Sequence, residues 1–375
     1  MKTIEADILN TKKHFLILDG LRGIAALSIV IFHFMEFVYP DSSKNFIGHG
    51  FLAVDFFFCL SGFVIGYAYD GRLSKMGVWE FFKSRLIRLH PLVIIGSVIG
   101  VLGFLFDPFS NEAGLYSAGR ILFLFICSVL LFPFPSMPDR GLQVFNFNSP
   151  SWSLFFEYVA NIFYGLVLYK ISKRYLYVLI LLAATALCLV SYRAGNLLGG
   201  WSGNNFSDGF ARVSYSFLAG LLVYRSGWII KNKLGFVGLS VMLLLAFMMP
   251  HFTWNWLAEL LVVLFYFPLL IALGAGAMLN NRFRNACVFL GKLSYPLYMT
   301  HYAAINWFGN YYLSHKVGTA QLFFIVITAT ILLIGFAYII MKVYDIPLRK
   351  YLTEKRTSAM NSKRNLTNHG VSINK

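Results

Sequence analysis

The chain has 375 residues, of which 58% are hydrophobic and only 13% are charged. Soluble domains carry about 25% charged residues, so this composition excludes an ordinary water-soluble fold. The formal net charge of +16 could indicate a nucleic-acid partner, but the basic residues stand in short clusters between apolar runs, as they do in the cytoplasmic loops of membrane proteins. We therefore expect an integral membrane protein that contacts lipid and binds no nucleic acid.

Eleven apolar segments follow one another along the chain, and a bilayer-spanning helix needs about 20 such residues. They predict an all-α fold, a polytopic transmembrane helix bundle, with one membrane domain over residues 1–345 and a basic, flexible cytoplasmic tail over residues 346–375. The four cysteines are isolated, so neither a disulfide framework nor a metal site is predicted. The segments are residues 15–39, 51–69, 91–106, 119–135, 151–169, 175–192, 210–224, 234–249, 256–279, 293–313 and 318–341.

The number of segments constrains the topology. If all eleven crossed from a cytoplasmic N-terminus, the basic C-terminal tail would lie outside, contrary to the positive-inside rule. Without segment 119–135, ten crossings remain, and both termini and the basic loops are cytoplasmic. We therefore expect residues 119–135 to be re-entrant, which is tolerated where protein shields the backbone. The loops then left outside are residues 40–50, 107–118, 193–209, 250–255 and 314–317.

Ionisable side chains inside apolar segments are costly, so each one is a candidate functional residue. Arg22 lies in the inner half of the first segment, and His33 lies about 16 Å further along a helix that rises 1.5 Å per residue. Asp55 and Glu157 stand near the outer ends of their segments, and either could orient His33 as a general base. Glu36 is interpreted instead as reaching the outer headgroups.

Arg85 and Arg88 are three residues apart, so they share one face of a predicted short amphipathic helix at the inner mouth, near Arg22. Guanidinium groups fit phosphate oxygens and stay charged, which suits a nucleotide-like ligand. Taken alone, the same ionisable residues would also suit a proton-coupled carrier or flippase for an acidic or sugar-linked solute. The residue pattern leaves this choice open.

Five blocks resemble, in the same order, the signature blocks of the acyltransferase-3 family of membrane O-acyltransferases. The resemblance spans residues 15 to 345 or so. The ionisable residues of the blocks are all present. Ala53, Ser84, Val93 and Tyr158 depart from the family pattern and weaken any guess about the acceptor. The blocks are LDGLRGIAALSIVIFH (18–33), AVDFFFCLSGFVI (53–65), RLIRLHP (85–91), SWSLFFE (151–157) and LSYPLYMTH (293–301).

The resemblance implies transfer of an acyl group, commonly acetyl from acetyl-CoA, to a hydroxyl of a surface polysaccharide or its lipid-linked precursor. It places the protein in a bacterial inner membrane, with acyl-CoA as donor substrate and no permanently bound cofactor. His33 would be the base, directly or through an acyl-histidine intermediate, with Asp55 or Glu157 as its partner.

The donor would lie with its nucleotide at the arginines and its thioester near His33, so that Arg22 and His33 mark two ends of one channel. Arg22, Arg85 and Arg88 are accordingly the predicted donor-binding residues. His301, Ser151 and Trp152 are candidates for acceptor contacts, although His301 could equally bond a helix carbonyl, and Trp152 could belong to the interfacial aromatic belt.

Overall fold

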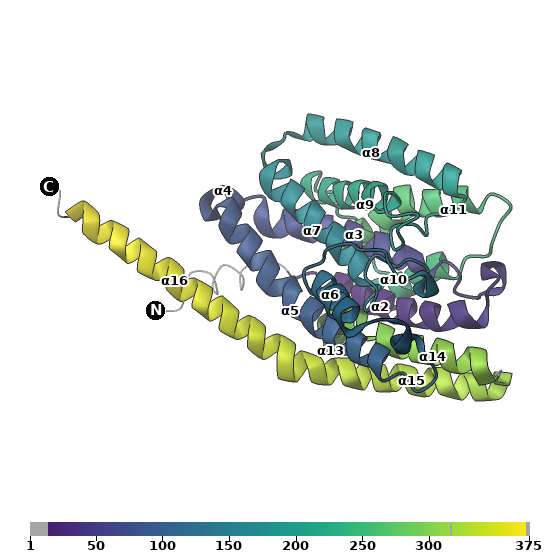
Figure 1. The fold of residues 1–375 in the computed structure, drawn as a ribbon. Helices are drawn as coiled ribbons and strands as arrows, with labels where there is room; N and C mark the ends of the chain where they lie inside the picture. The colour runs from purple at the N-terminus through teal and green to yellow at the C-terminus, as the bar shows by residue number, and fades with distance from the viewer. Residues whose placement is uncertain (1–13, 316, 373–375) are drawn as a thin grey trace.

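The computed structural model describes residues 14–315 and 317–372, with side chains as far as residue 360, and these ranges form a helical bundle without strands (Figure 1). The all-α prediction is confirmed, and each predicted apolar segment contains a helix. The helices are α2 (Leu16–Val38), α3 (Ala53–Tyr69), α4 (Leu73–Met76), α5 (Val78–Leu105), α6 (Ala118–Val129), α7 (Ser151–Leu166), α8 (Lys173–Ala194), α9 (Asp208–Arg225), α10 (Gly235–Phe247), α11 (Asn255–Leu261), α12 (Phe267–Gly276), α13 (Arg284–Thr300), α14 (Tyr302–His315), α15 (Thr319–Ile340) and α16 (Ile346–Ser372).

Length and hydropathy make the protein an integral membrane protein. In the described ranges, 7 helical stretches are long and apolar enough to span a bilayer, among them α2, α5, α8 and the stretch that α11 and α12 form around a π-helical turn. The apolar helices α6 and α10 are shorter. The total of ten crossings therefore stays a prediction.

Close packing of α3 on α9 holds the centre of the bundle. A Cβ atom on Gly62 would collide with the carbonyl of Phe217, and one on Gly220 would collide with the carbonyl of Cys59. Small residues at these positions let the two backbones approach closely. The resulting van der Waals contacts stabilise the helix pair, because the hydrophobic effect does not drive helices together in lipid. Helices α2 and α13 pack against each other in the same way, with Gly23 against Leu290.

The loops predicted to be cytoplasmic meet at one end of the bundle. At the end of α3, the Asp70 carboxylate accepts hydrogen bonds from both Nε and Nη2 of Arg225, which ends α9 (2.7 and 2.9 Å). Arg225 also donates to the carbonyl of Leu168, after α7 (2.8 Å). Three loops assigned to one side from their charge therefore lie together.

Loops predicted to be outside meet likewise. His49 contacts the side-chain oxygen of Asn255, in the loop 250–255 (2.9 Å), and the backbone N–H of Leu197 donates to Glu259, just after that loop (2.6 Å). Residues before and after α6 also pair at this end, since Arg140 donates to Glu112 at 3.1 Å. Such a meeting of the two flanks is the arrangement expected of a re-entrant segment, and the re-entrant course of residues 119–135 stays a prediction.

Helix α5 differs from expectation. The segment was predicted to begin at Pro91, with Arg85 and Arg88 on a separate short helix, but one helix runs from Val78 through Pro91. Proline lacks the N–H that would bond the carbonyl four residues earlier. A membrane helix tolerates this where side chains and neighbouring helices bond the backbone, and here the Tyr295 hydroxyl donates to the carbonyl of Leu89, two residues before the proline (2.6 Å).

The predicted single crossing over residues 293–313 is interrupted at His301, which separates α13 from α14. Asn148, from the loop before α7, donates to the carbonyl of Met299 beside the break (3.1 Å). The interruption places the His301 ring against His33, with 5.5 Å between the ring centroids.

The basic tail is helical where the structure describes it. After a π-helical turn, α15 continues directly into α16, and the two lie along one side of the bundle before α16 projects beyond it (Figure 1). Arg349 near the start of α16 contacts Asp345 (2.8 Å). The predicted boundary at residue 345 therefore falls inside a continuous helix. The predicted cytoplasmic N-terminus, residues 1–13, lies outside the described residues.

Candidate functional site

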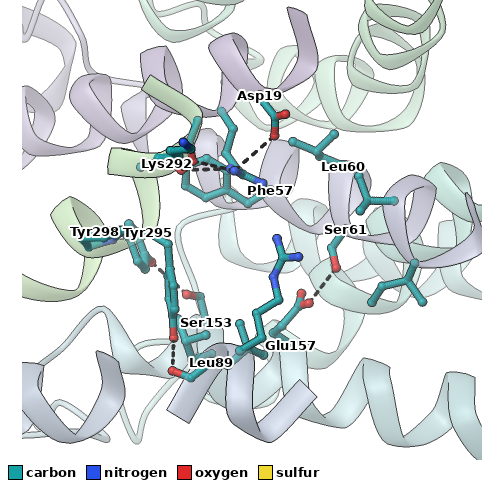
Figure 2. Close-up of a pocket in the computed structure, with 18 of the residues that line it drawn as sticks. Asp19, Phe57, Leu60, Ser61, Leu89, Ser153, Glu157, Lys292, Tyr295 and Tyr298 are labelled. Carbon is teal, nitrogen blue, oxygen red and sulfur yellow. Dashed lines mark hydrogen bonds and ion pairs between the residues drawn. The ribbon is translucent and has the colours of Figure 1, made fainter. Parts of the chain in front are cut away.

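Two cavities meet inside the bundle. The first, of about 370 Å³, is shown in Figure 2. It is called the arginine cavity because Arg22, Arg85 and Arg88 line it. The second, of about 440 Å³, is called the histidine cavity because His33 lines it. Val54 and Tyr298 line both, so the two cavities adjoin at these side chains.

Arg22 is fixed to α13 in the arginine cavity. Its Nη2 donates to the carbonyl of Gly291 (2.6 Å), and its Nε donates to the hydroxyl of Ser294 (2.9 Å). Asp19, one turn earlier on α2, contacts the same guanidinium (3.2 Å). The structure thus brings Arg22 into one cavity with Arg85 and Arg88, as its predicted position in the inner half of the first segment suggested.

Glu157 also belongs to the arginine cavity. Its Oε1 accepts hydrogen bonds from Arg85 Nη2 (3.0 Å) and from the hydroxyl of Ser61 (2.6 Å). The Ser61–Glu157 bond lies across the cavity from the bond between Tyr295 and Leu89 (Figure 2). The sequence-based pairing of Glu157 with His33 is therefore not found. Glu157 was predicted to stand near the outer membrane surface because it is close to the start of its segment. That prediction was wrong because α7 begins inside the protein, with Ser151 and Trp152 buried at its first turn.

Cations exceed carboxylates in the arginine cavity. Arg88 extends into it, and within the described part of the chain its guanidinium makes no hydrogen bond or ion pair. The sequence did not point to Lys292 or Arg349, from α13 and α16, yet both line the same space. Three carboxylates, of Asp19, Glu157 and Asp345, stand against five Lys or Arg side chains. Such a surplus favours a phosphorylated or otherwise anionic ligand.

A histidine–carboxylate pair characterises the histidine cavity. His33 Nδ1 lies 2.6 Å from Glu36 Oε2, one helical turn further along α2. If Nδ1 carries the ring proton and donates a hydrogen bond to the carboxylate, Nε2 is unprotonated and can accept a proton from a substrate. The sequence interpretation assigned Glu36 to the headgroups, although the spacing of three residues already made the two side chains neighbours on a helix.

Loops and α14 complete the histidine cavity. Tyr302 packs edge-on against the His33 ring (5.4 Å between centroids), and its hydroxyl accepts a hydrogen bond from Gln143 (2.9 Å). Arg140, bonded to Glu112, and the indole of Trp201 line the same cavity. Aromatic faces beside amides and hydroxyls suit a ligand that carries both ring surfaces and hydroxyl groups.

Asp55 is held by an arginine rather than by His33. Arg212 Nε and Nη2 donate to the two carboxylate oxygens (3.1 and 2.5 Å), and Nη1 donates to the carbonyl of Gly199 (2.7 Å). Asp55 and Arg212 are both fully buried. Pairing of Asp55 with His33 is therefore not found either. Sequence reasoning missed Arg212, although an arginine within the apolar segment 210–224 was itself a signal.

The three candidates for acceptor contacts separate in space. Trp152 lines the histidine cavity, where the Arg212 guanidinium stacks 5.1 Å from its ring centre. His301 stacks against the His33 ring and does not line the cavity. Its Nδ1 contacts the carbonyl of Leu297 (3.1 Å), which fits the alternative that His301 hydrogen-bonds a helix carbonyl. Ser151 is buried and lines neither cavity.

Comparisons with known proteins agree with the arrangement. A family described as an acyltransferase domain matches residues 15–341. Protein 2 in the picA locus of Rhizobium radiobacter is 33% identical over 162 residues, which is 41% of this chain and 82% of that protein. A protein of Staphylococcus aureus (strain COL), named "Putative O-acetyltransferase", is 26% identical over 367 residues, 89% of this chain and 57% of that protein.

The O-acetyltransferase OatA of Staphylococcus aureus (strain NCTC 8325) is 38% identical over 80 residues, 20% of this chain and 12% of that protein. This chain thus spans little more than half of the strain COL relative and a small part of OatA. No solved structure matches the chain.

Proposed function

The chain belongs to the acyltransferase-3 family, and from that premise we propose that it transfers an acyl group, acetyl in the first instance, from acyl-CoA to a hydroxyl of a surface polysaccharide or its lipid-linked precursor. The observation that carries the proposal is the junction of two unlike cavities, one cationic and one holding a His–Glu pair, at Val54 and Tyr298. The names of the Staphylococcus aureus relatives, both O-acetyltransferases, support the acetyl group.

In this proposal the arginine cavity binds the phosphates of the donor. Arg85, Arg88 and Arg22 face one space with more cations than carboxylates, and guanidinium groups bind phosphate through paired hydrogen bonds. The donor's pantetheine arm then extends past Val54 and Tyr298, so that the thioester enters the histidine cavity. Arg22 and His33 are about 16 Å apart along α2 at 1.5 Å per residue, a distance that an extended arm has to bridge.

The chemistry takes place at His33. Its Nε2 accepts the proton of the acceptor hydroxyl while the hydroxyl oxygen attacks the thioester carbonyl carbon. The new C–O bond forms, the C–S bond breaks, and the departing thiolate takes the proton from the imidazolium. Glu36, at 2.6 Å from Nδ1, orients the ring and stabilises its positive charge during the transfer.

Transfer of radiolabelled acetyl from acetyl-CoA tests the proposal directly. Membranes that contain the protein are incubated with the labelled donor and a lipid-linked glycan, and membranes without the protein serve as control. We expect label in the glycan only when the protein is present. Absence of transfer from any acyl-CoA, together with uptake of a solute driven by a proton gradient, would establish the carrier or flippase function instead.

We also propose a bacterial inner membrane location with the arginine cavity open to the cytoplasm, where acyl-CoA is made. The clustering of the basic loops at one end supports this orientation. With Lys170→Cys as the only reactive surface cysteine, we expect labelling by a membrane-impermeant maleimide in inverted vesicles and none in intact cells. The reverse pattern would contradict the orientation.

Arg349 provides a further test, since it lines the arginine cavity from α16 and lies beyond the residues that the family matches. We expect Arg349→Ala to raise the KM for acetyl-CoA by about tenfold, the lower range for one charge-assisted hydrogen bond, with little change in kcat. Arg349→Lys should recover part of the loss, and Lys350→Ala, on the exposed side of α16, should have no effect. An unchanged KM in Arg349→Ala would remove α16 from the donor site.

A further inference from the structure

Charge distinguishes the histidine cavity from the arginine cavity. The charged residues that line the histidine cavity, apart from His33, are Glu36, Glu112, Asp139, Arg140 and Arg212, so that three carboxylates stand against two guanidinium groups. In the arginine cavity the surplus has the opposite sign. Two cavities of opposite charge are suited to ligands of different charge.

Both arginines of the histidine cavity already have a carboxylate partner. Arg212 is fully buried, and its Nε and Nη2 donate to the carboxylate of Asp55. Arg140 donates from Nε to Glu112 (3.1 Å) and from Nη1 to the carbonyl of Asn146 (3.2 Å). Each guanidinium charge is therefore balanced within the protein, and neither arginine gives the cavity a net positive charge.

The carboxylates of Glu36 and Asp139 have uncharged partners instead. Glu36 lies 2.6 Å from His33 Nδ1, and a histidine that acts as a base is neutral before the reaction. Asp139 accepts a hydrogen bond from the Tyr116 hydroxyl (2.9 Å). Over the described ranges, neither carboxylate forms an ion pair with a Lys or Arg side chain. A ligand in this cavity therefore meets a net negative charge.

An amide of the same cavity favours a ligand with hydroxyl groups. Gln143 is 8% exposed, and its Nε2 donates to the Tyr302 hydroxyl (2.9 Å). Its buried Oε1 accepts no hydrogen bond from the part of the chain that the structure describes. A buried acceptor without a donor costs free energy. A sugar hydroxyl can donate the missing hydrogen bond, whereas an ionised acid group has no proton to donate.

We propose that the sugar that receives the acyl group is uncharged, and that Glu36 and Asp139 exclude uronic acids and other acidic sugars from the histidine cavity. The inference rests on the proposed acyl transfer and deepens it, because it names the class of acceptor. Like charges brought together in a partly dehydrated site disfavour binding. Neutral hexoses, deoxyhexoses and N-acetylated amino sugars form the accepted class.

The test uses pairs of alkyl glycosides as membrane acceptors, each pair consisting of an octyl uronide and its methyl ester in the glucose, galactose and mannose series. The two members have the same hydroxyl groups and differ in charge. We expect membranes with the protein to transfer labelled acetyl to the ester at least about tenfold faster than to the acid. In about 1 M salt, where the Debye length is about 3 Å, the ratio of ester to acid transfer should fall.

Asp139→Asn removes one of the two charges and keeps the shape of the side chain. It should lower the ratio of ester to acid transfer by about threefold, a modest change because Asp139 is exposed and its charge is partly screened. Asp41→Asn is the matched control, since Asp41 is an exposed carboxylate of a predicted outer loop and lines neither cavity. It should leave the ratio at the wild-type value.

Equal transfer to acid and ester would overturn the proposal. A preference for the acid would also overturn it, and would show that Arg140 binds the sugar carboxylate in place of Glu112. A ratio that Asp139→Asn leaves unchanged, or that Asp41→Asn lowers equally, would contradict exclusion by Asp139. If no pair is acetylated, the sugar that carries label in the lipid-linked glycan decides: an uncharged sugar supports the proposal, and an acidic one overturns it. Lack of transfer to every acceptor would instead contradict the proposed function.

Discussion

Replacing His33 with alanine is expected to lower acyl transfer by about 100- to 10,000-fold, the range that a positioned general base contributes, while acyl-CoA still binds. Among the described residues that line the histidine cavity, His33 is the one that combines a nitrogen able to accept a proton with a carboxylate partner. The donor phosphates are proposed to bind at the arginines of the other cavity, so loss of the imidazole should lower kcat and leave donor affinity intact. Label transfer and binding of labelled acetyl-CoA to the same membranes measure the two effects separately.

His90→Ala is the matched control, because His90 lies on α5 and lines neither cavity. It should retain transfer near the wild-type level. Equal transfer by wild type and His33→Ala would contradict the role of His33, and a parallel loss in His90→Ala would attribute the effect to general damage to the bundle.

Glu36 acts through His33 in the proposed mechanism, and this makes its contribution separable. Glu36→Gln alone should slow transfer, because an amide neither stabilises the imidazolium nor selects the proton on Nδ1 as a carboxylate does. The double variant with His33→Ala should be no slower than His33→Ala by itself, since residues that work as one unit are not additive. A further decrease in the double variant would show that Glu36 contacts a substrate independently.

The sequence predicted the relative positions of residues that lie on the same helix. The spacing of Arg22 and His33 along α2 placed them in different cavities, because a helix rises by a constant amount per residue. The same rule failed for Glu157, since α7 starts within the protein rather than at the surface. Local spacing also contained the His33–Glu36 pair, but the outward position of Glu36 suggested a residue in the headgroup region.

Contacts between distant segments were beyond sequence reasoning. Gln143 reaches Tyr302 across the fold, and Arg349 enters the arginine cavity only because α16 continues α15 without a break. Neither contact has a periodicity or a motif of its own. Arg212 is different, because a lone arginine in an apolar segment requires a partner; what one sequence could not tell is that the partner is Asp55.

The buried pair of Asp55 and Arg212 leads to the second large expected effect. Asp55→Ala would leave the Arg212 guanidinium, 0% exposed, without its carboxylate. Removal of one member of a buried ion pair costs about 3–5 kcal/mol, so we expect a strong loss of thermal stability in detergent and low accumulation in membranes. Lys44→Ala, which breaks the exposed contact with Asp41, should leave the melting temperature unchanged.

Replacement of both members separates a structural role of Asp55 from a catalytic one. With Asp55→Ala and Arg212→Met together no charge is left unpaired, and an apolar replacement of a buried pair is often tolerated, so most of the lost stability should return. A double variant as unstable as the sum of the two single losses would show that the pair is not coupled. If the stable double variant still transfers acetyl, Asp55 serves to hold α3 against α9, whereas a stable but inactive double variant would return Asp55 or Arg212 to the catalytic site.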